Sequence, residues 1–305
     1  MTQEKLHSRD FQEDKLYELI MGYTCNLRCL FCSTPPERNV LNKSSEELFR
    51  DIYRARKEGY KILGLGGGEP TLRKDLPRFV RFAKKAGFEV VRMETNGFLL
   101  SNFELCKRLV DAGMDFFKIS VHGHKAQIHD FLTQREGSFQ RIMKAIENLH
   151  KLEMRIEASI VLTKTNYKFV PQYVDFFSRQ GIHSFCIIFP EYAGYMRLNY
   201  REIGITMTEV APYVQEAMEI IRSLGLDKGL VFNIPRCFLG SYADSVVEKY
   251  NMKLMTPHIV VEDADLDIRE GKQKFVRCKK CPYESQCSGV WKNYIEIYGD
   301  REFSE

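Results

Sequence analysis

The sequence of 305 residues lacks the features that would place a protein in a membrane or outside the cell. No apolar run is long enough to cross a bilayer, and the first residues have no apolar core like that of a signal peptide. The nine cysteines are not spread like the disulfide framework of a secreted domain. We therefore expect a cytoplasmic protein with no membrane partner, whose cysteines are held by metal in a reducing compartment.

A strong charge of one sign is also missing, since 45 Lys and Arg against 41 Asp and Glu leave a net charge of +4. The best basic stretch, Lys272 to Lys280, is short and is better explained as a solvated face. Nucleic acid is therefore not the expected partner. A composition of 44% hydrophobic and 28% charged residues is that of a globular protein with a sizeable core.

What the sequence does contain is a regular alternation of strand and helix patterns up to residue 189. Strands are predicted over 16–23, 60–66, 88–93, 115–121, 155–162 and 184–189, with helices over 44–59, 73–87, 102–112, 138–152 and 170–180. Parallel strands need crossover connections, so six β/α units imply an α/β fold with helices outside a parallel sheet. Periodicity alone leaves a partial barrel and a doubly wound sheet both open. In either, functional residues gather at the carboxyl ends of the strands.

The pattern changes after Pro190. Residues 192–200 are predicted to form an aromatic loop and 208–224 a helix, and beyond Gly229 the periodicity fades while four cysteines appear. We expect three parts: an N-terminal extension over 1–15, a core domain over 16–225 and a small Cys-rich C-terminal domain over 226–305.

Three cysteines, Cys25, Cys29 and Cys32, follow the first strand with x3 and x2 spacing. Thiolates packed this tightly bind a soft metal, either zinc or an iron–sulfur cluster. A zinc site would need a fourth Cys or His, and none follows nearby. Because a four-iron cluster takes four ligands, three cysteines leave one iron open to an exogenous ligand. The pattern favours the cluster over a zinc knuckle.

This loop, with Phe31 directly before its last cysteine, resembles the signature of the radical S-adenosylmethionine (SAM) superfamily. The resemblance implies a partial (β/α)6 barrel, a [4Fe-4S] cluster on the three cysteines, SAM on its open iron and Phe31 near the adenine. The second strand ends in Gly67-Gly68-Glu69, similar to the family's Gly-Gly-Glu motif. Glycines admit a ligand to the backbone and a carboxylate accepts from an ammonium, so the motif implies a receptor for the amino group of SAM.

Further candidate SAM contacts follow the third and fourth strands. Asn96 stands before Gly97, and the pair is explained either as a turn or as a contact to the ribose or carboxylate of SAM, which the resemblance implies. Ser120 fits the family pattern of a SAM contact. His122 stands where relatives often carry an acid; a neutral imidazole can bond a ribose hydroxyl, or it can lie behind the contact residues.

The tail contains Cys278, Cys281 and Cys287, whose spacing resembles part of the SPASM domain of radical SAM peptide maturases, which carries two auxiliary clusters. The next cysteine of that pattern falls where Trp291 stands, so a second auxiliary cluster is not expected. The segment is similar to the shortened twitch variant, which implies one auxiliary [4Fe-4S] cluster with Cys237 as fourth ligand. A structural zinc on the same four residues is the alternative. Cys106 and Cys186 occupy apolar positions and are predicted to be core.

The resemblance implies a course of reaction. An external electron donor, similar to flavodoxin or ferredoxin, reduces the first cluster, SAM is cleaved, and a 5′-deoxyadenosyl radical abstracts hydrogen from a substrate. A fully Cys-ligated auxiliary cluster favours a role in electron transfer.

The sequence leaves the substrate open between a peptide brought by a partner and a small molecule such as a sugar, nucleoside or cofactor precursor. Fifteen N-terminal residues are too few for the leader-binding domain that many peptide-modifying relatives carry. Candidate contacts, or packing between the domains, are Tyr192, Tyr195, Arg197 and Tyr200. Two other classes compete: a zinc-binding interaction module without turnover, which the Gly-Gly-Glu turn argues against, and a radical enzyme acting on RNA, which predicts a basic barrel mouth.

Overall fold

The computed structural model describes residues 15–34, 41–226 and 228–303. Its main sheet has nine strands in the order β7-β6-β5-β4-β3-β2-β1-β8-β9, all parallel except for the antiparallel β8–β9 pair. The strands are β1 (Leu16–Ile20), β2 (Ile62–Gly66), β3 (Val90–Thr95), β4 (Phe116–Ser120), β5 (Ile156–Val161), β6 (Ser184–Ile188), β7 (Lys228–Phe232), β8 (Met252–Met255) and β9 (Val260–Val261). A separate antiparallel pair joins β10 (Lys272–Gln273) to β11 (Val290–Trp291).

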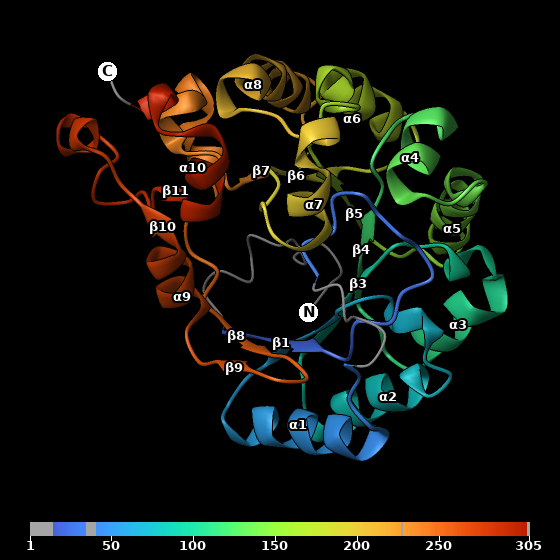
Figure 1. The fold of residues 1–305 in the computed structure, drawn as a ribbon. Helices are drawn as coiled ribbons and strands as arrows, with labels where there is room; N and C mark the ends of the chain where they lie inside the picture. Colours follow the sequence, from blue (N-terminus) through green and yellow to red (C-terminus); the bar gives the residue numbers. More distant parts are fainter. Residues whose placement is uncertain (1–14, 35–40, 227, 304–305) are drawn as a thin grey trace.

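Most of the helices form a ring outside these strands (Figure 1). The helices are α1 (Ser45–Lys57), α2 (Leu76–Ala86), α3 (Phe103–Asp111), α4 (Ala126–Thr133), α5 (Ser138–Lys151), α6 (Val170–Arg179), α7 (Gly194–Ile203), α8 (Met207–Ser223), α9 (Ala264–Gly271) and α10 (Lys292–Tyr298). Of these, α7 lies inside the ring, across the strand ends. Short 3-10 turns are η3 (Pro70–Leu72), η4 (Leu99–Ser101), η5 (Tyr167–Phe169), η6 (Arg236–Phe238), η7 (Gly240–Ser245), η8 (Val276–Lys280) and η9 (Arg301–Phe303).

Strand order decides between the two architectures that the periodicity left open. From β1 to β7 each strand lies beside the next one in the chain. A doubly wound sheet reverses its order at a switch point and places helices on both faces, whereas this order keeps one winding direction. The sheet therefore curls into an open barrel with helices outside (Figure 1), and the predicted α/β partial barrel is confirmed.

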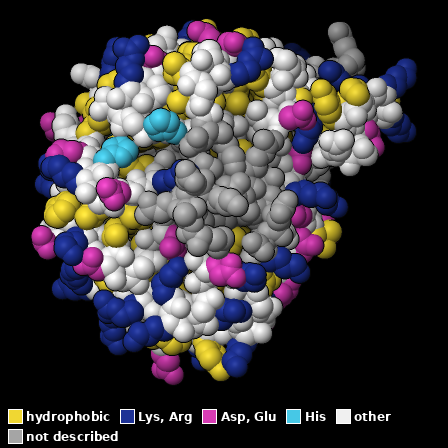
Figure 2. Space-filling view, turned by 180° about the vertical axis from the view of Figure 1, so that it is seen from behind, with side chains coloured by type: hydrophobic (Ala, Val, Ile, Leu, Met, Phe, Trp, Pro, Cys, Tyr) yellow, Lys and Arg dark blue, Asp and Glu magenta, His cyan; other side chains and the backbone are white. Residues whose placement is uncertain are grey.

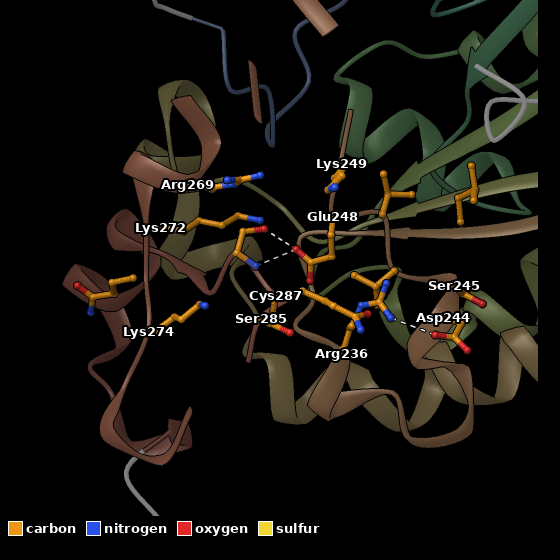
Figure 3. Close-up of a pocket in the computed structure, with 16 residues that line it drawn as sticks. Arg236, Asp244, Ser245, Glu248, Lys249, Arg269, Lys272, Lys274, Ser285 and Cys287 are labelled. Atoms are coloured by element: carbon orange, nitrogen blue, oxygen red, sulfur yellow. Dashed lines mark hydrogen bonds and ion pairs between the residues drawn. The ribbon is translucent and has the colours of Figure 1, made fainter. Parts of the chain in front are cut away.

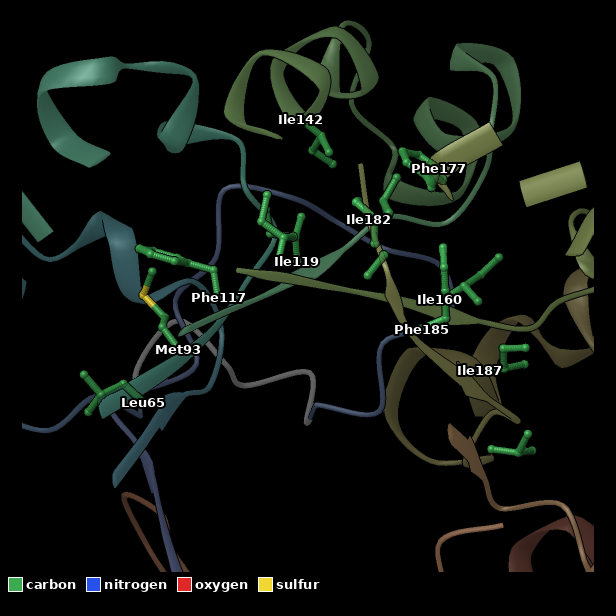
Figure 4. Packing of buried hydrophobic residues seen from close by; sticks show 14 of the residues in the cluster. Leu65, Met93, Phe117, Ile119, Ile142, Ile160, Phe177, Ile182, Phe185 and Ile187 are labelled. Atoms are coloured by element: carbon green, nitrogen blue, oxygen red, sulfur yellow. The ribbon is translucent and has the colours of Figure 1, made fainter. Parts of the chain in front are cut away.

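The outward face of the barrel is apolar and packs against the helices. Figure 4 shows Leu65, Met93, Phe117, Ile160 and Ile187 of successive strands in one buried cluster with side chains of the surrounding helices. Side chains alternate along a strand, so the residues between these point inward. The hydrophobic core therefore lies between the sheet and the helices, and the alternate side chains of each strand line the barrel interior.

The interior holds buried charges. The Arg92 guanidinium donates to Glu18 at 2.7 Å, and the Lys118 ammonium lies 3.1 Å from Glu94. Burial raises the pKa of Glu18, and the charge of Arg92 opposes that shift. Gly64 allows this packing, because a Cβ there would collide with the Glu18 carboxylate. Each buried charge is thus compensated by a partner that is distant in the sequence, up to 74 positions away for Glu18 and Arg92.

The predicted elements of the six β/α units are found within a few residues of their predicted bounds. The prediction of an aromatic loop over 192–200 is wrong, because residues 194–203 form the helix α7. Met196 and Ile203, seven positions apart, are both buried and give this helix an inward face that the polar residues between them obscure. The eight-residue α4 was also missed; its buried face includes His129 and Thr133, which an apolar pattern does not reveal.

The C-terminal segment completes the sheet as well as carrying cysteines. β7 extends the sheet beyond β6, while β8 and β9 extend it beyond β1 on the opposite side. A domain division at residue 225 thus stays a prediction. Except for Lys15, the predicted N-terminal extension lies outside the described residues. No helix in the described ranges has both the length and the apolar character required to span a membrane.

Candidate cofactor and metal sites

A pocket of about 170 Å³ opens at the carboxyl ends of the first five strands. Nine residues predicted from the sequence line it: Cys25, Cys29, Phe31, Cys32, Gly67, Gly68, Asn96, Ser120 and His122. The folding of the barrel thus brings together side chains that the chain separates by almost one hundred residues. Six lining residues were not predicted: Tyr23, Leu27, Thr34, Glu94, Thr95 and Val161. Glu94 and Thr95 adjoin a predicted contact, whereas no pattern in the sequence distinguishes the other four.

Backbone hydrogen bonds hold the cysteine loop from two sides. On one side the N–H groups of Gly68 and Glu69 donate to the carbonyls of Gly22 and Thr24, both at 2.9 Å. On the other side Leu30 N–H donates to a carbonyl at the end of α4 at 2.9 Å. At the start of α7, Tyr195 N–H donates to the Cys32 carbonyl at 2.8 Å. The two helices that the sequence did not reveal are therefore supports of the cysteine loop.

Both glycines of the Gly-Gly-Glu turn are required by this close approach. A Cβ on Gly68 would stand 2.5 Å from the Tyr23 carbonyl oxygen and closer still to that of Thr24. Gly67 has φ +125°, a region that only glycine adopts easily, and a Cβ there would strike the Gly22 carbonyl. These positions admit the backbone of the cysteine loop, whether or not they also admit a ligand.

Glu69 lies beneath the pocket and does not line it. Its carboxylate accepts from the Thr95 hydroxyl and the Asn96 N–H, both at 2.7 Å, and from the N–H of Thr71 at 3.0 Å and its hydroxyl. Burial raises the pKa of this carboxyl, and the hydrogen bonds oppose that shift. In this structure Glu69 ties η3 to the end of β3, and its contact with an amino group stays a prediction.

Asn96 combines the two explanations that the sequence left open. Its side-chain oxygen accepts from Phe98 N–H at 3.0 Å, and Gly97 follows with φ +72°, so the segment is a turn. Its amide nitrogen donates to Asn26 at 2.8 Å and lies 3.6 Å from the sulfur of Cys25. Asn96 is therefore a turn residue whose N–H group is directed at a candidate metal ligand.

His122 is a buried, neutral histidine in the pocket wall. Its ring lies 4.3 Å from the ring of Phe31 and stacks on His129 at 5.8 Å. Desolvation lowers the pKa of His122 well below its ordinary value. Its Nδ1 accepts from Val161 N–H at 3.2 Å, so a neutral ring carries its proton on Nε2. Nearby, the hydroxyls of Ser120 and Ser159 lie 3.4 Å apart.

The residues present fit a three-cysteine cluster with a ligand on its open iron. All three sulfurs line one pocket whose remaining wall offers glycine backbone, an amide, a hydroxyl and an imidazole N–H. The sulfur of Cys25 also accepts from Leu27 N–H at 3.4 Å, the kind of bond that tunes iron–sulfur centres. Polar hydrogen-bond donors beside three thiolates suit a bound molecule that carries both charged and hydroxyl groups.

The other four predicted cysteines also converge. Cys237 in η6 lines one small cavity, of about 30 Å³, together with Cys278, Cys281 and Cys287. The sulfur of Cys278 accepts from Phe275 N–H at 3.4 Å, and that of Cys287 from Gly289 N–H at 3.3 Å. Burial raises the pKa of Cys287 to about 11, so metal binding there must release a proton.

The four cysteines share this cavity, which suits either a thiolate-ligated cluster or a zinc ion. In the described part of the chain, no three Cys, His, Asp or Glu side chains approach closely enough to hold a single ion. Zinc draws its thiolates to about 2.3 Å from one centre. Binding of a zinc ion would therefore draw the sulfurs closer together.

The candidate substrate contacts after β6 lie elsewhere. Tyr192 is fully buried, with its ring 5.4 Å from that of Tyr298 in α10. Arg197 pairs with Glu296 of the same helix at 2.8 Å. Neither of them, nor Tyr195 or Tyr200, lines the pocket of Cys25, so the structure favours the alternative of packing against the C-terminal segment. Cys106 and Cys186 are fully buried, as predicted.

An open α/β barrel with three cysteines at the carboxyl ends of its strands defines a class of metal-dependent proteins. The family model of the radical SAM superfamily matches residues 19–176, a span that holds the whole three-cysteine pocket. The chain belongs to the radical SAM superfamily. Membership implies a [4Fe-4S] cluster and SAM as cofactors and an electron donor as partner.

Two curated relatives show how far the sequence likeness extends. The "Probable GTP 3',8-cyclase" of Sulfolobus acidocaldarius is 31% identical over 56% of this chain and 54% of its own length. The "Fe-coproporphyrin III synthase" of Methanosarcina barkeri is 26% identical over 62% of this chain and 47% of its own. The chain thus spans about half the length of these relatives.

Solved structures extend the likeness of the fold to the C-terminal segment. Streptococcus suis SuiB bound to S-adenosylmethionine superposes with a TM-score of 0.69 over 93% of this chain and 74% of its own, at 15% identity. Native anSMEcpe with bound AdoMet gives 0.65 over 91% of this chain and 90% of its own, at 17% identity. At these identities the likeness shows the fold.

Proposed function

We propose that this protein is a radical SAM enzyme that cleaves SAM reductively and abstracts hydrogen from a small-molecule substrate, with one auxiliary [4Fe-4S] cluster. The observation that carries the proposal is the convergence of Cys25, Cys29 and Cys32 with Asn96, Ser120 and His122 in one pocket. When bound there, the reduced cluster and SAM supply a 5′-deoxyadenosyl radical for hydrogen abstraction.

The chain's own residues hold the reactants and shield them. The three cysteines hold the first cluster, and Phe31 and His122 close one wall of the pocket with their rings. His122 offers its Nε2–H to a hydroxyl or carboxylate of SAM, because Val161 N–H fixes the proton on that nitrogen. Ser120 and the backbone of Gly67 and Gly68 complete the polar wall.

The auxiliary cluster is proposed on Cys237, Cys278, Cys281 and Cys287. Support comes from the shared cavity, from the N–H groups directed at two of the sulfurs and from the spacing of the cysteines. Four cysteines would leave no open iron, so this cluster serves electron transfer and not substrate binding.

A small molecule is proposed in preference to a peptide. The curated relatives with 26–31% identity carry names that refer to GTP and to iron coproporphyrin III. SuiB was solved bound to the precursor peptide SuiA, but its identity of 14% supports the fold alone. A peptide that stimulates 5′-deoxyadenosine formation by the purified enzyme would reverse this preference.

The proposed partners follow from the chemistry. An external donor similar to flavodoxin or ferredoxin supplies the electron, and the protein works in the cytoplasm. On the face shown in Figure 2, Lys and Arg side chains are interspersed with Asp and Glu, which supports the proposal that nucleic acid is not a substrate.

The first test is the metal content of anaerobically reconstituted protein. About eight irons with matching sulfide support two clusters. About four irons with one zinc would keep the radical enzyme and make the tail structural. Zinc alone would favour the interaction module instead.

A second test is SAM cleavage with a chemical reductant. Alanine variants of Cys25, Cys29 and Cys32 should each abolish it, whereas Cys106→Ala, a buried thiol in α3, serves as the matched control and should retain it. Cleavage that survives in all three variants would overturn the assignment. Cys278→Ala should remove about four irons and leave the first cluster spectroscopically intact.

A further inference from the structure

A larger cavity, of about 790 Å³, lies in the C-terminal part of the chain. Its walls come from β7, Arg236 of η6, residues 244–249, residues 269–274 around the start of β10, and residues 285–288 (Figure 3). It shares Gln273, Lys274 and Cys287 with the four-cysteine cavity and no residue with the pocket of Cys25. Sites for small molecules usually measure roughly 300–1,000 Å³, so this cavity has the size of one.

The lining carries an excess of positive charge. Five lining residues are cationic and two are acidic: Arg236, Lys249, Arg269, Lys272 and Lys274 against Asp244 and Glu248. The whole chain has a net charge of only +4, so the cavity concentrates cations that the rest of the protein balances.

Part of this charge is already paired. Arg236 lies 3.0 Å from Asp244, and Lys274 lies 3.0 Å from Glu284 at the edge. The Glu248 carboxylate accepts from the Ser288 N–H at 3.0 Å and from the hydroxyl of the same residue. In the described ranges, the remaining cations, Lys249, Arg269 and Lys272, have no ion pair within 4 Å.

Lys272 is the unusual member of the three, because it is only 8% exposed. Its ammonium lies 5.1 Å from the centre of the Trp291 ring, a contact that offsets part of the cost of burying a charge. Figure 3 shows Lys272 and Arg269 extending together from one wall toward Glu248 and Lys249. The carboxylates of Glu248 and Glu191 already offset part of the charge of Lys272, and an anion bound beside its ammonium would add to that compensation.

We propose that this cavity binds a small molecule with at least two negative charges, carried by phosphates or carboxylates, with Lys272 as its buried contact and Arg269 and Lys249 at its entrance. The ligand would lie beside Cys287, next to the proposed auxiliary cluster. This inference rests on the cavity and its charges and goes beyond the proposed cleavage of SAM.

Titration calorimetry on the reconstituted protein tests the proposal, with fructose 1,6-bisphosphate, glutarate and uncharged fructose as probes. We expect the bisphosphate, the dicarboxylate or both to bind, more weakly as salt rises, and fructose not to bind. Binding of one charged probe alone identifies phosphate or carboxylate as the recognised group. The assay uses neither reductant nor SAM turnover, so its failure is distinct from a failure of SAM cleavage.

Variants locate the binding. Lys272→Met keeps the apolar stem over Trp291 and removes the charge, and it should weaken binding about ten-fold or more, as expected for loss of a charge-assisted bond. The double variant Arg269→Ala/Lys249→Ala, at exposed positions, should weaken binding to a similar degree and fold normally. Arg50→Ala, an exposed cation on α1, is the matched control and should bind like the unmodified protein.

The proposal fails if neither charged probe binds at millimolar concentration. It fails equally if both cavity variants bind as Arg50→Ala does. Should Lys272→Met not fold, the exposed double variant alone decides between these outcomes.

Discussion

Replacing Gly68 by alanine tests whether the Gly-Gly-Glu turn supports the cysteine loop. Gly68 has an ordinary backbone conformation, so the substitution adds one methyl group and no conformational strain. The methyl would stand 2.5 Å or less from two carbonyl oxygens, those of Tyr23 and Thr24. Both are backbone atoms, and Thr24 precedes the first cluster ligand directly. The loop carrying Cys25 must therefore move.

The size of the effect follows from the contacts that would be lost. Overpacking by one methyl costs about 1–3 kcal/mol. If the loop moves away instead, the bonds from Gly68 and Glu69 to Gly22 and Thr24 weaken, at about 0.5–1.5 kcal/mol each. Unfolding entropy of about 2.1 cal/mol/K per residue converts such a loss into a decrease of roughly 2–5 °C in the thermal midpoint. We also expect the first cluster to assemble poorly, because Cys25 is displaced.

The assay compares thermal midpoint and iron content after anaerobic reconstitution. Gly229→Ala is the matched control, because Gly229 also has an ordinary conformation and its added methyl meets the side-chain ends of Met218 and Ile221 and no backbone atom. The control should keep its iron and its midpoint to within a degree or two. A Gly68→Ala protein with full iron content and an unchanged midpoint would refute the account of the turn given above.

Three further predictions concern the barrel and its pocket. Burial lowers the pKa of His129 to about 4. The unfolded chain therefore binds a proton on this imidazole more tightly than the folded chain does. As a result, the free energy of unfolding falls as the pH decreases from about 6.5 toward 4. Between pH 7 and pH 5 the free energy of unfolding should fall by about 2 kcal/mol. In the His129→Asn variant, the denaturation midpoint should depend less on pH across this range. Arg92→Met leaves Glu18 buried without its partner and should cost roughly 3–5 kcal/mol in denaturant unfolding; the double variant with Glu18→Gln should recover part of it, and no recovery would contradict the pairing. Asn96→Leu removes the N–H directed at Cys25 and should lower the reduction potential of the first cluster in a spectroscopic titration, since donors to sulfur favour the reduced state; an unchanged potential would assign Asn96 to the turn alone.

Local patterns made the ligand residues predictable. Cys25, Cys29 and Cys32 line one pocket from one loop, so their spacing is visible in the sequence as a motif. The strands were predictable for a similar reason, since a strand buried on both faces in a parallel sheet is a short apolar run. Asn96, Ser120 and His122 could be placed because each lies at or just after the end of a predicted strand, and parallel strands end at one rim.

The supports of the site could not be predicted, because they act through backbone groups or distant partners. α4 and α7 hold the cysteine loop through main-chain carbonyls, which any residue type supplies. The Glu18–Arg92 pair joins positions 74 residues apart, and neither residue carries a local signature. The charges of the large cavity come from three separate segments, so no single stretch of the sequence reveals them.

The C-terminal segment connects the two candidate metal sites mechanically. Cys237 follows β7, one edge of the barrel sheet. Near the other edge β8 pairs with β1, which leads into the loop of Cys25. A metal centre that joins Cys237 to Cys278 would close a loop of about forty residues around β8, and cross-links of that span restrict the unfolded chain by roughly 3–4 kcal/mol. The tail would then hold both edges of an open barrel whose strand ends carry the first pocket. A metal on these four cysteines is therefore expected to be structural as well, whatever electrons pass through it.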